Sequence, residues 1–191
     1  MNPTHDCPAQ PSPRDRILVA AHDLFYRDGV RATGIDKIIE RSKVTKVTFY
    51  RQYPSKDDLI RAYLDYRHVH WMRWFRTTLE DHVANGQAPS EALVATLTQW
   101  FSQDEFRGCA FLNSSAELGT ADPEILKIVR QHKDDMTAVL EGLVPPGAAR
   151  ATKARALALA VDGAIVHAQM GHPLPLVLDG LRTLIHPVLT P

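Results

Sequence analysis

Apolar residues recur at helical spacing along almost the whole chain, and this pattern constrains the fold most. In residues 14–28, Ile17, Ala20, Ala21, Leu24 and Phe25 form one apolar stripe at intervals of three and four. No run of Val, Ile or Thr alternates with polar residues beside a two-residue glycine turn, as a hairpin requires. The sequence therefore predicts an all-α fold of about nine helices.

Glycine, proline and short polar residues mark where these helices begin and end. Gly29 follows the first helix, Thr45 is placed to cap the third, and Pro54 ends it, because the residue before a proline avoids the α region. The expected helices cover residues 14–28, 35–42, 45–53, 56–83, 90–101, 108–118, 122–143, 153–170 and 175–189.

Composition excludes several classes of protein. The 191 residues are 45% hydrophobic and 23% charged, which is typical of a globular protein. Two cysteines are too few for a disulfide framework, so we expect a reduced, cytoplasmic protein. No segment approaches the roughly 20 apolar residues that span a bilayer, so no membrane association is expected. Residues 1–13 contain four prolines and are expected to form a mobile tail.

Basic residues gather in one segment, although the 22 Lys plus Arg balance the 22 Asp plus Glu overall. From Arg41 to Lys56 there are five basic residues and no acidic one. A basic run alone is more typical of a solvated face. Here it coincides with short helices and a tight turn, which is the pattern of a helix-turn-helix. In that motif the second helix lies in the major groove of DNA.

Residues 29–60 read GVRATGIDKIIERSKVTKVTFYRQYPSKDDLI. Through this string, residues 14–60 resemble the DNA-binding region of the tetracycline-repressor (TetR) family. Val47 stands where the family often has glycine, which changes what this end of the helix offers to DNA. The matching positions are Gly29, Thr33, Ile38, Ile39, Thr45, Lys46, Thr48, Phe49, Tyr50, Tyr53, Ser55, Lys56, Asp57, Asp58 and Leu59.

The resemblance implies a DNA-binding domain over residues 14–60 and a ligand-binding and dimerisation domain over residues 61–191. Side chains with positive charge, hydroxyls or amides suit phosphates and base edges. Val47 and Thr48 are expected nearest the bases. The expected DNA contacts are Thr33, Lys43, Thr45, Lys46, Val47, Thr48, Tyr50, Arg51, Gln52 and Lys56.

The layout of the family also implies an effector pocket among the helices that follow. Aromatic residues are plentiful there, and a pocket needs apolar walls with a few polar groups. We therefore expect a small apolar or aromatic effector. Cys109 is either a redox sensor or, more simply, a small buried residue. The expected pocket residues are Trp71, Trp74, Phe75, Trp100, Phe101, Cys109, Phe111, Asn113, His132, Met136, His167 and Met170.

The last two helices carry more apolar surface than one domain needs, and the family implies that they form a two-fold interface. The alternative is that both helices only complete the core of the monomer. The expected interface residues are Leu157, Val161, Ile165, Leu178, Leu181 and Ile185.

No enzyme or metal motif accompanies these features. The nine histidines show no zinc-ligand spacing, and phosphate-binding loops, nucleophile elbows and dinucleotide fingerprints are absent. We therefore expect no cofactor and no catalysis. The expected function is a ligand-responsive transcriptional regulator, a repressor that binds operator double-stranded DNA as a homodimer. The competing hypothesis is a helical ligand-binding or adaptor protein that does not bind DNA.

Overall fold

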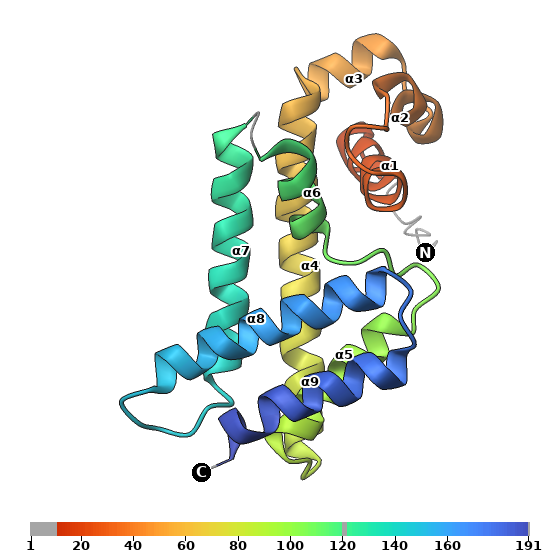
Figure 1. Ribbon diagram of the computed structural model, residues 1–191. Helices are drawn as coiled ribbons and strands as arrows, with labels where there is room; N and C mark the ends of the chain where they lie inside the picture. Colours follow the sequence, from red (N-terminus) through yellow and green to blue (C-terminus); the bar gives the residue numbers. More distant parts are fainter. Residues whose placement is uncertain (1–10, 120–121, 191) are drawn as a thin grey trace, which may run out of the picture. The chain divides into compact units, whose positions relative to one another are not determined.

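A computed structural model describes residues 11–119 and 122–190 of the chain (Figure 1). Its described residues form nine α-helices and no strand, which confirms the all-α prediction. The helices are α1 (Pro13–Asp28), α2 (Ile35–Ser42), α3 (Lys46–Gln52), α4 (Lys56–Ala84), α5 (Pro89–Phe101), α6 (Ala110–Leu118), α7 (Pro123–Glu141), α8 (Arg150–Gln169) and α9 (Leu174–Leu189).

Side-chain caps explain where several helices begin. Ser12 accepts a hydrogen bond from the backbone N–H of Asp15 at the start of α1. Asp122 accepts from the N–H groups of Glu124 and Ile125 at the start of α7. The first finding corrects the expected tail at residues 1–13, because Pro13 already belongs to α1 and Ser12 caps it. Residues 1–10 of that tail lie outside the described residues.

The chain divides between Tyr63 and Leu64 into two compact units. In the first unit α1, α2 and α3 pack on one another. Ile17, Ile38, Phe49 and Leu59 are completely buried there. Tyr63 closes this core, because its ring meets the Phe25 ring edge-on at 5.4 Å.

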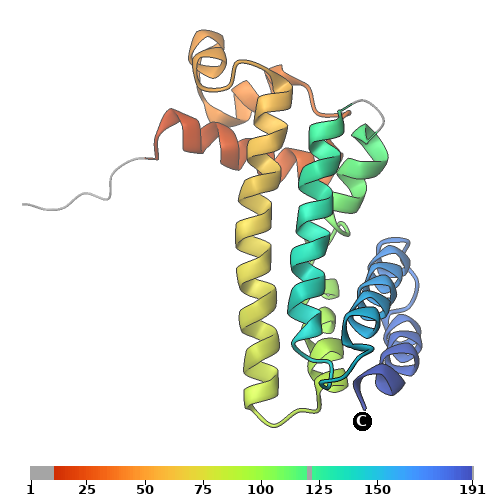
Figure 2. The same cartoon turned by 90° about the vertical axis from the view of Figure 1, so that its left-hand side faces the viewer.

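The second unit contains the rest of α4 and helices α5 to α9. Figure 2 shows α7 running beside this part of α4, and α8 packs on both α7 and α9. Its core includes Leu93, Leu97, Leu157 and Val161, all with no exposed surface. No helix among the residues that the structure describes combines the length and the apolar character needed to cross a membrane.

A buried imidazole joins α4 to α7 within this second unit. His132 is 2% exposed, and its ring stacks on the Phe111 ring with the centroids 3.5 Å apart. Its Nδ1 shares one hydrogen bond of 3.1 Å with Nδ1 of His68. Burial, assisted by the positive charge of Lys133, lowers the pKa of His132 to about 2. The ring is therefore neutral in the folded protein.

This neutral imidazole makes the free energy of unfolding depend on pH. The unfolded chain takes up a proton on His132 below about pH 6.5, whereas the folded chain does not. Stability contributed by this site is therefore complete above that pH and is lost as the pH falls, by up to about 1.4 kcal/mol per pH unit. Urea unfolding of the wild type and of His132→Phe, between about pH 7 and about pH 5, measures the difference in slope.

The exposed Thr77 on α4 supplies the control, since Thr77→Val changes no titratable group and should keep the slope of the wild type. An equal pH slope in the wild type and in His132→Phe would show that His132 titrates normally in the folded protein.

Candidate nucleic-acid interface

Helix α3 is short, and its orientation is fixed by a cap at its start and by the burial of one of its faces. The Thr45 hydroxyl accepts from the backbone N–H of Thr48 at 3.2 Å and so caps the helix. Phe49 has no exposed surface and Tyr53, the residue that ends α3, is 1% exposed. Because these two rings are buried, the opposite face of α3 meets solvent. That face carries Lys46, Val47, Tyr50 and Arg51, all exposed.

The turn between α2 and α3 contains only Lys43 and Val44 ahead of the Thr45 cap. Lys43 adopts a left-handed conformation with φ 54° and ψ 43°, and its N–H donates to the Glu40 carbonyl at 3.2 Å. The Val44 N–H donates to the Ile39 carbonyl at 3.4 Å. A residue with a Cβ pays about 1 kcal/mol for this conformation, which the tight turn requires. The result is the helix-turn-helix geometry expected from the sequence.

The prediction that Thr33 contacts DNA is wrong for its side chain. Thr33 has no exposed surface. Its hydroxyl donates to the Gly29 carbonyl at 2.7 Å and lies 3.3 Å from the Leu24 carbonyl. Gly29 is the C-cap of α1, where the backbone acceptor has no partner within the helix. Thr33 therefore closes α1 and holds the loop before α2.

The other nine predicted DNA residues all lie between Lys43 and Lys56 and reach the surface. Thr48, Gln52 and Lys56 are half-buried, and the rest are exposed. The Lys56 amine lies 6.0 Å from the centroid of the Phe25 ring, so its stem packs along the core of this unit. Tyr50 is 41% exposed and meets Phe49 edge-on at 5.3 Å, which holds its ring upright on α3. Contact of these residues with DNA stays a prediction.

Two arginines that the sequence reasoning missed lie beside this face. Arg14 donates through Nη1 to the Gln52 carbonyl at 2.9 Å and lies 4.5 Å above the Tyr53 ring. Arg16 donates through Nη1 to the Lys43 carbonyl at 3.5 Å. Both are exposed in the first turn of α1, where positive charge opposes the helix dipole. That unfavourable placement is the sequence signal that could have identified them.

The predicted effector pocket is a packed aromatic core in this structure. The free space lined by Arg67, Trp71, Trp100, Cys109, Ala110, Phe111 and His132 amounts to about 10 Å³. That holds one water molecule, whereas sites for drug-sized ligands enclose roughly 300–1,000 Å³. The Trp71 N–H in this core is buried without a hydrogen-bond partner. Cys109 is buried, which favours its structural interpretation over a redox sensor.

Two residues assigned to that pocket do not belong to it. His167 and Met170 are exposed, and Met170 keeps 69% of its surface open. Both lie on the side of the C-terminal end of α8 that faces away from the core. Asn113 is half-buried and donates to the Arg107 carbonyl at 3.0 Å, so its amide holds the loop before α6.

The prediction is wrong for five of the six interface residues on α8 and α9. Leu157, Val161, Ile165, Leu181 and Ile185 are at most 2% exposed within the single chain, and Leu178 is half-buried. The five buried side chains face the core of the second unit, whereas Leu178 keeps part of its surface open. Leu159, Leu176 and Leu184 are instead 62–70% exposed.

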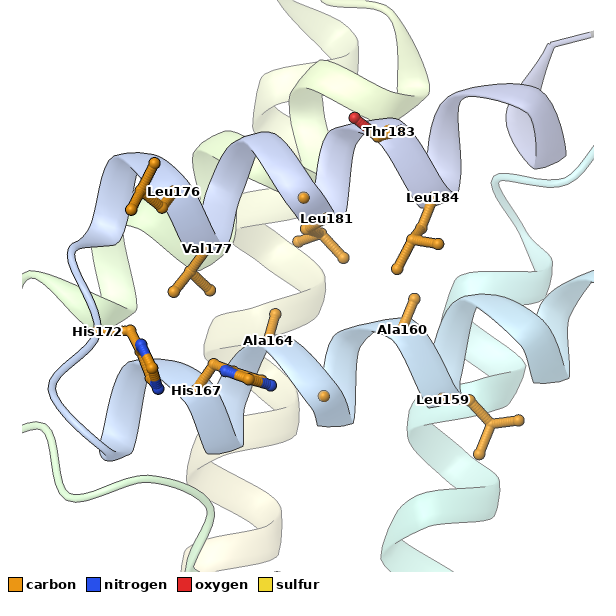
Figure 3. A pocket seen from close by; sticks show the side chains of 12 residues that line it. Leu159, Ala160, Ala164, His167, His172, Leu176, Val177, Leu181, Thr183 and Leu184 are labelled. Carbon is orange, nitrogen blue, oxygen red and sulfur yellow. The ribbon is translucent and has the colours of Figure 1, made fainter.

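An apolar groove runs between α8 and α9 on this exposed side. Its volume is about 600 Å³, and Figure 3 shows Val177 and Leu184 of α9 pointing toward Ala160 and Ala164 of α8. Gly163 and Gly180 also line it, and the absence of side chains there keeps the groove open. We refer to this surface, with its flanking Leu159, Leu176 and Leu184, as the α8–α9 face.

Comparisons with known proteins agree with this architecture. The family model for bacterial regulatory proteins of the tetR family matches residues 17–63. The crystal structure of a TetR-family transcriptional regulator from Streptomyces coelicolor has a TM-score of 0.73 and 29% sequence identity to this chain, covering 93% of this chain and 96% of that one. Residues 17–63 therefore match the tetR family by sequence, and the chain shares the fold of a TetR-family regulator. This is a family of regulatory proteins rather than of enzymes.

Sequence relatives match shorter stretches. An uncharacterized HTH-type transcriptional regulator of Lactococcus lactis is 26% identical over 128 residues, which are 64% of this chain and 63% of that protein. The HTH-type transcriptional activator FasR of Mycolicibacterium smegmatis is 39% identical over 56 residues, 29% of this chain and 25% of FasR. The chain thus spans less than two thirds of either relative, and the match to FasR is only about as long as the DNA-binding region.

The role of Thr33 in this TetR-type unit is testable by removing its hydroxyl alone. Thr33→Val keeps the shape of the side chain but leaves the Gly29 carbonyl without its 2.7 Å donor. Gly29 is half-buried, so the loss of this hydrogen bond should cost about 1 kcal/mol. We expect urea unfolding of Thr33→Val to show a decrease of this size in the free energy of unfolding.

The exposed Thr77 on α4 provides the control, because Thr77→Val should change the free energy of unfolding by no more than about 0.5 kcal/mol. Equal stabilities for the two variants would contradict a structural role for the Thr33 hydroxyl.

Proposed function

We propose that this protein is a TetR-family transcriptional regulator that binds operator DNA as a homodimer and responds to a small apolar or aromatic effector. The observation that carries the proposal is the exposed face of α3. It presents Lys46, Tyr50 and Arg51 to solvent, and no acidic residue occurs between Arg41 and Lys56. Duplex DNA carries closely spaced phosphates, so this face attracts it by charge, and binding is favoured by the release of counterions.

Helix α3 is the element that suits the major groove. It is capped, short and held by Phe49 and Tyr53, so it presents a rigid convex face. Lys43, Lys56, Arg14 and Arg16 flank this face within the same unit and supply charge for the phosphate backbone on either side of the groove.

The α8–α9 face is the proposed dimer contact. Its exposed leucines and its groove of about 600 Å³ form a large apolar surface, whose exposure to water is unfavourable in free energy. A second copy offers the same ridges and groove, so a two-fold contact buries both at once. A stable interface needs roughly 1,200–2,000 Å² of total buried area. Two helices from each copy can supply it as a four-helix bundle.

Helix α4 provides the proposed route from effector to DNA. One continuous helix carries Lys56 near its start and Trp71 in the aromatic core of the second unit. Because that core encloses only about 10 Å³, an effector must displace side chains such as Phe111 to enter. The displacement would shift α4 and so bias the DNA-binding unit between two states.

The direction of regulation is part of the proposal. We propose release from the operator on effector binding, and therefore repression in the cytoplasm. The test is a reporter gene under the promoter of the gene that encodes this protein. Deletion of the regulator should raise reporter expression if the protein represses, and lower it if the protein activates, as the name of FasR says of that protein.

Two lysines test the DNA-binding face. Lys46→Ala and Lys56→Ala each remove one cation from a phosphate, so the affinity for duplex DNA should fall several-fold for every sequence. The slope of log affinity against log salt should fall by roughly one unit per variant. Fluorescence anisotropy with labelled duplexes at several salt concentrations measures both quantities.

Lys127 on α7 lies outside this face and is 79% exposed, so Lys127→Ala should bind as the wild type does. Unchanged affinity and salt slope in both α3-side variants would reject the proposed docking, and absence of any duplex binding by the wild type would favour the adaptor hypothesis.

A charge on the α8–α9 face tests the dimer. Leu159→Glu with Leu184→Glu places carboxylates where the proposed contact would bury them, which strongly disfavours association. Light scattering should report a monomer, and binding to a two-half-site duplex should weaken because the half-sites are no longer linked.

Val69→Glu is the control, because Val69 is also an exposed apolar residue, 49% open, but lies on α4. It should leave the dimer intact. A folded double variant that still scatters as a dimer would place the interface elsewhere.

A further inference from the structure

The most exposed large apolar side chain in the described residues lies in the middle of the basic face of α3. Val47 is 79% exposed, more than Leu176 or Leu159 on the α8–α9 face. It does not support the fold, because Phe49 and Tyr53 alone anchor this helix in the core. The isopropyl group lies in water between the exposed Lys46 and the half-buried Thr48, so it is free to contact an apolar partner from outside the chain.

The neighbours of Val47 define what that partner is. Tyr50 lies three residues further along α3 and is therefore beside Val47 on the helix surface. Lys46 and Arg51 extend positive charge from the same exposed face. An apolar spot ringed by cations does not suit a second protein core, from which charge is depleted. It suits a polyanion that carries small apolar groups recessed between its charges.

Duplex DNA has this chemistry at one place only. The major groove displays the C5-methyl group of thymine, and the phosphates line both rims of the groove. We infer that Val47 contacts thymine methyl groups and selects for thymine at one position in each half-site. This inference rests on the proposed DNA-binding function and adds to it the base that the face selects.

The contact gives Val47 a role distinct from that of the lysines. Charge contacts raise affinity for all sequences, because every nucleotide carries a phosphate. The methyl contact discriminates between bases, since cytosine has no methyl group at C5 and presents an amino group beside that position in the groove. Removing Val47 therefore relaxes selectivity while the salt dependence stays unchanged.

The experiment starts from duplexes that the full-length protein selects from a random library. This selection does not require the operator sequence to be known. In the tightest-binding duplex each thymine is replaced in turn by uracil, which deletes the methyl group and nothing else. One replacement in each half-site should lower affinity about fourfold, the factor that corresponds to about 0.8 kcal/mol for one buried methyl-sized group. Anisotropy titration measures each duplex.

The decisive step repeats these titrations with Val47→Ala. In that variant the sensitive position should tolerate uracil with almost no loss, because the partner of the methyl group is gone. Val19→Ala alters an exposed valine on α1, 49% open, and should keep the fourfold loss. Selection with Val47→Ala should also yield duplexes in which thymine is no longer required at that position.

The outcomes separate this inference from the function on which it rests. If the library yields no enriched sequence, the proposed function fails. If a sequence is enriched but no uracil replacement matters, or if the loss is equally large in Val47→Ala, DNA binding stands and the assignment of Val47 is overturned.

Discussion

Burial of Phe49 and Tyr53 is the constraint on which the DNA-binding surface depends. These two rings fix the rotation of α3, so that one face packs on α1 and α2 and the other meets solvent. Seven residues make too short a helix to be stable alone, and its orientation comes from this packing together with the Thr45 cap. The left-handed turn at Lys43 then sets where α3 begins relative to α2. The proposed chemistry of Lys46, Val47, Tyr50 and Arg51 follows from that single rotation.

The sequence predicted the helices well because their boundaries are local. Ser12, Thr45 and Asp122 cap through their own side chains, and prolines lie at the first or second position of α1, α5, α7 and α9. The face of α3 was equally predictable, since Phe49 is the large apolar ring of this short helix and only one side of the helix can be buried.

Longer-range choices were not predictable from one sequence. Helix α8 carries apolar residues on both sides, with Leu157 completely buried and Leu159 69% exposed. Spacing shows that two stripes exist, but it does not tell which one covers the monomer core. The same limit applies to the aromatic core, where the residues were identified but their close packing against His132 was not. Thr33 was misassigned because its motif position says nothing of the α1 carbonyls that it binds.

Protection of lysine amines by DNA tests the central claim most directly, since one measurement compares all the faces of the protein. Acetylation of the intact protein, with and without a selected duplex, is read out residue by residue by mass spectrometry. The account predicts that DNA protects Lys43, Lys46 and Lys56, while Lys127, 79% exposed on α7, reacts as fast as before. Protection of Lys127 with continued reaction of Lys46 would contradict the assignment of α3 to the DNA.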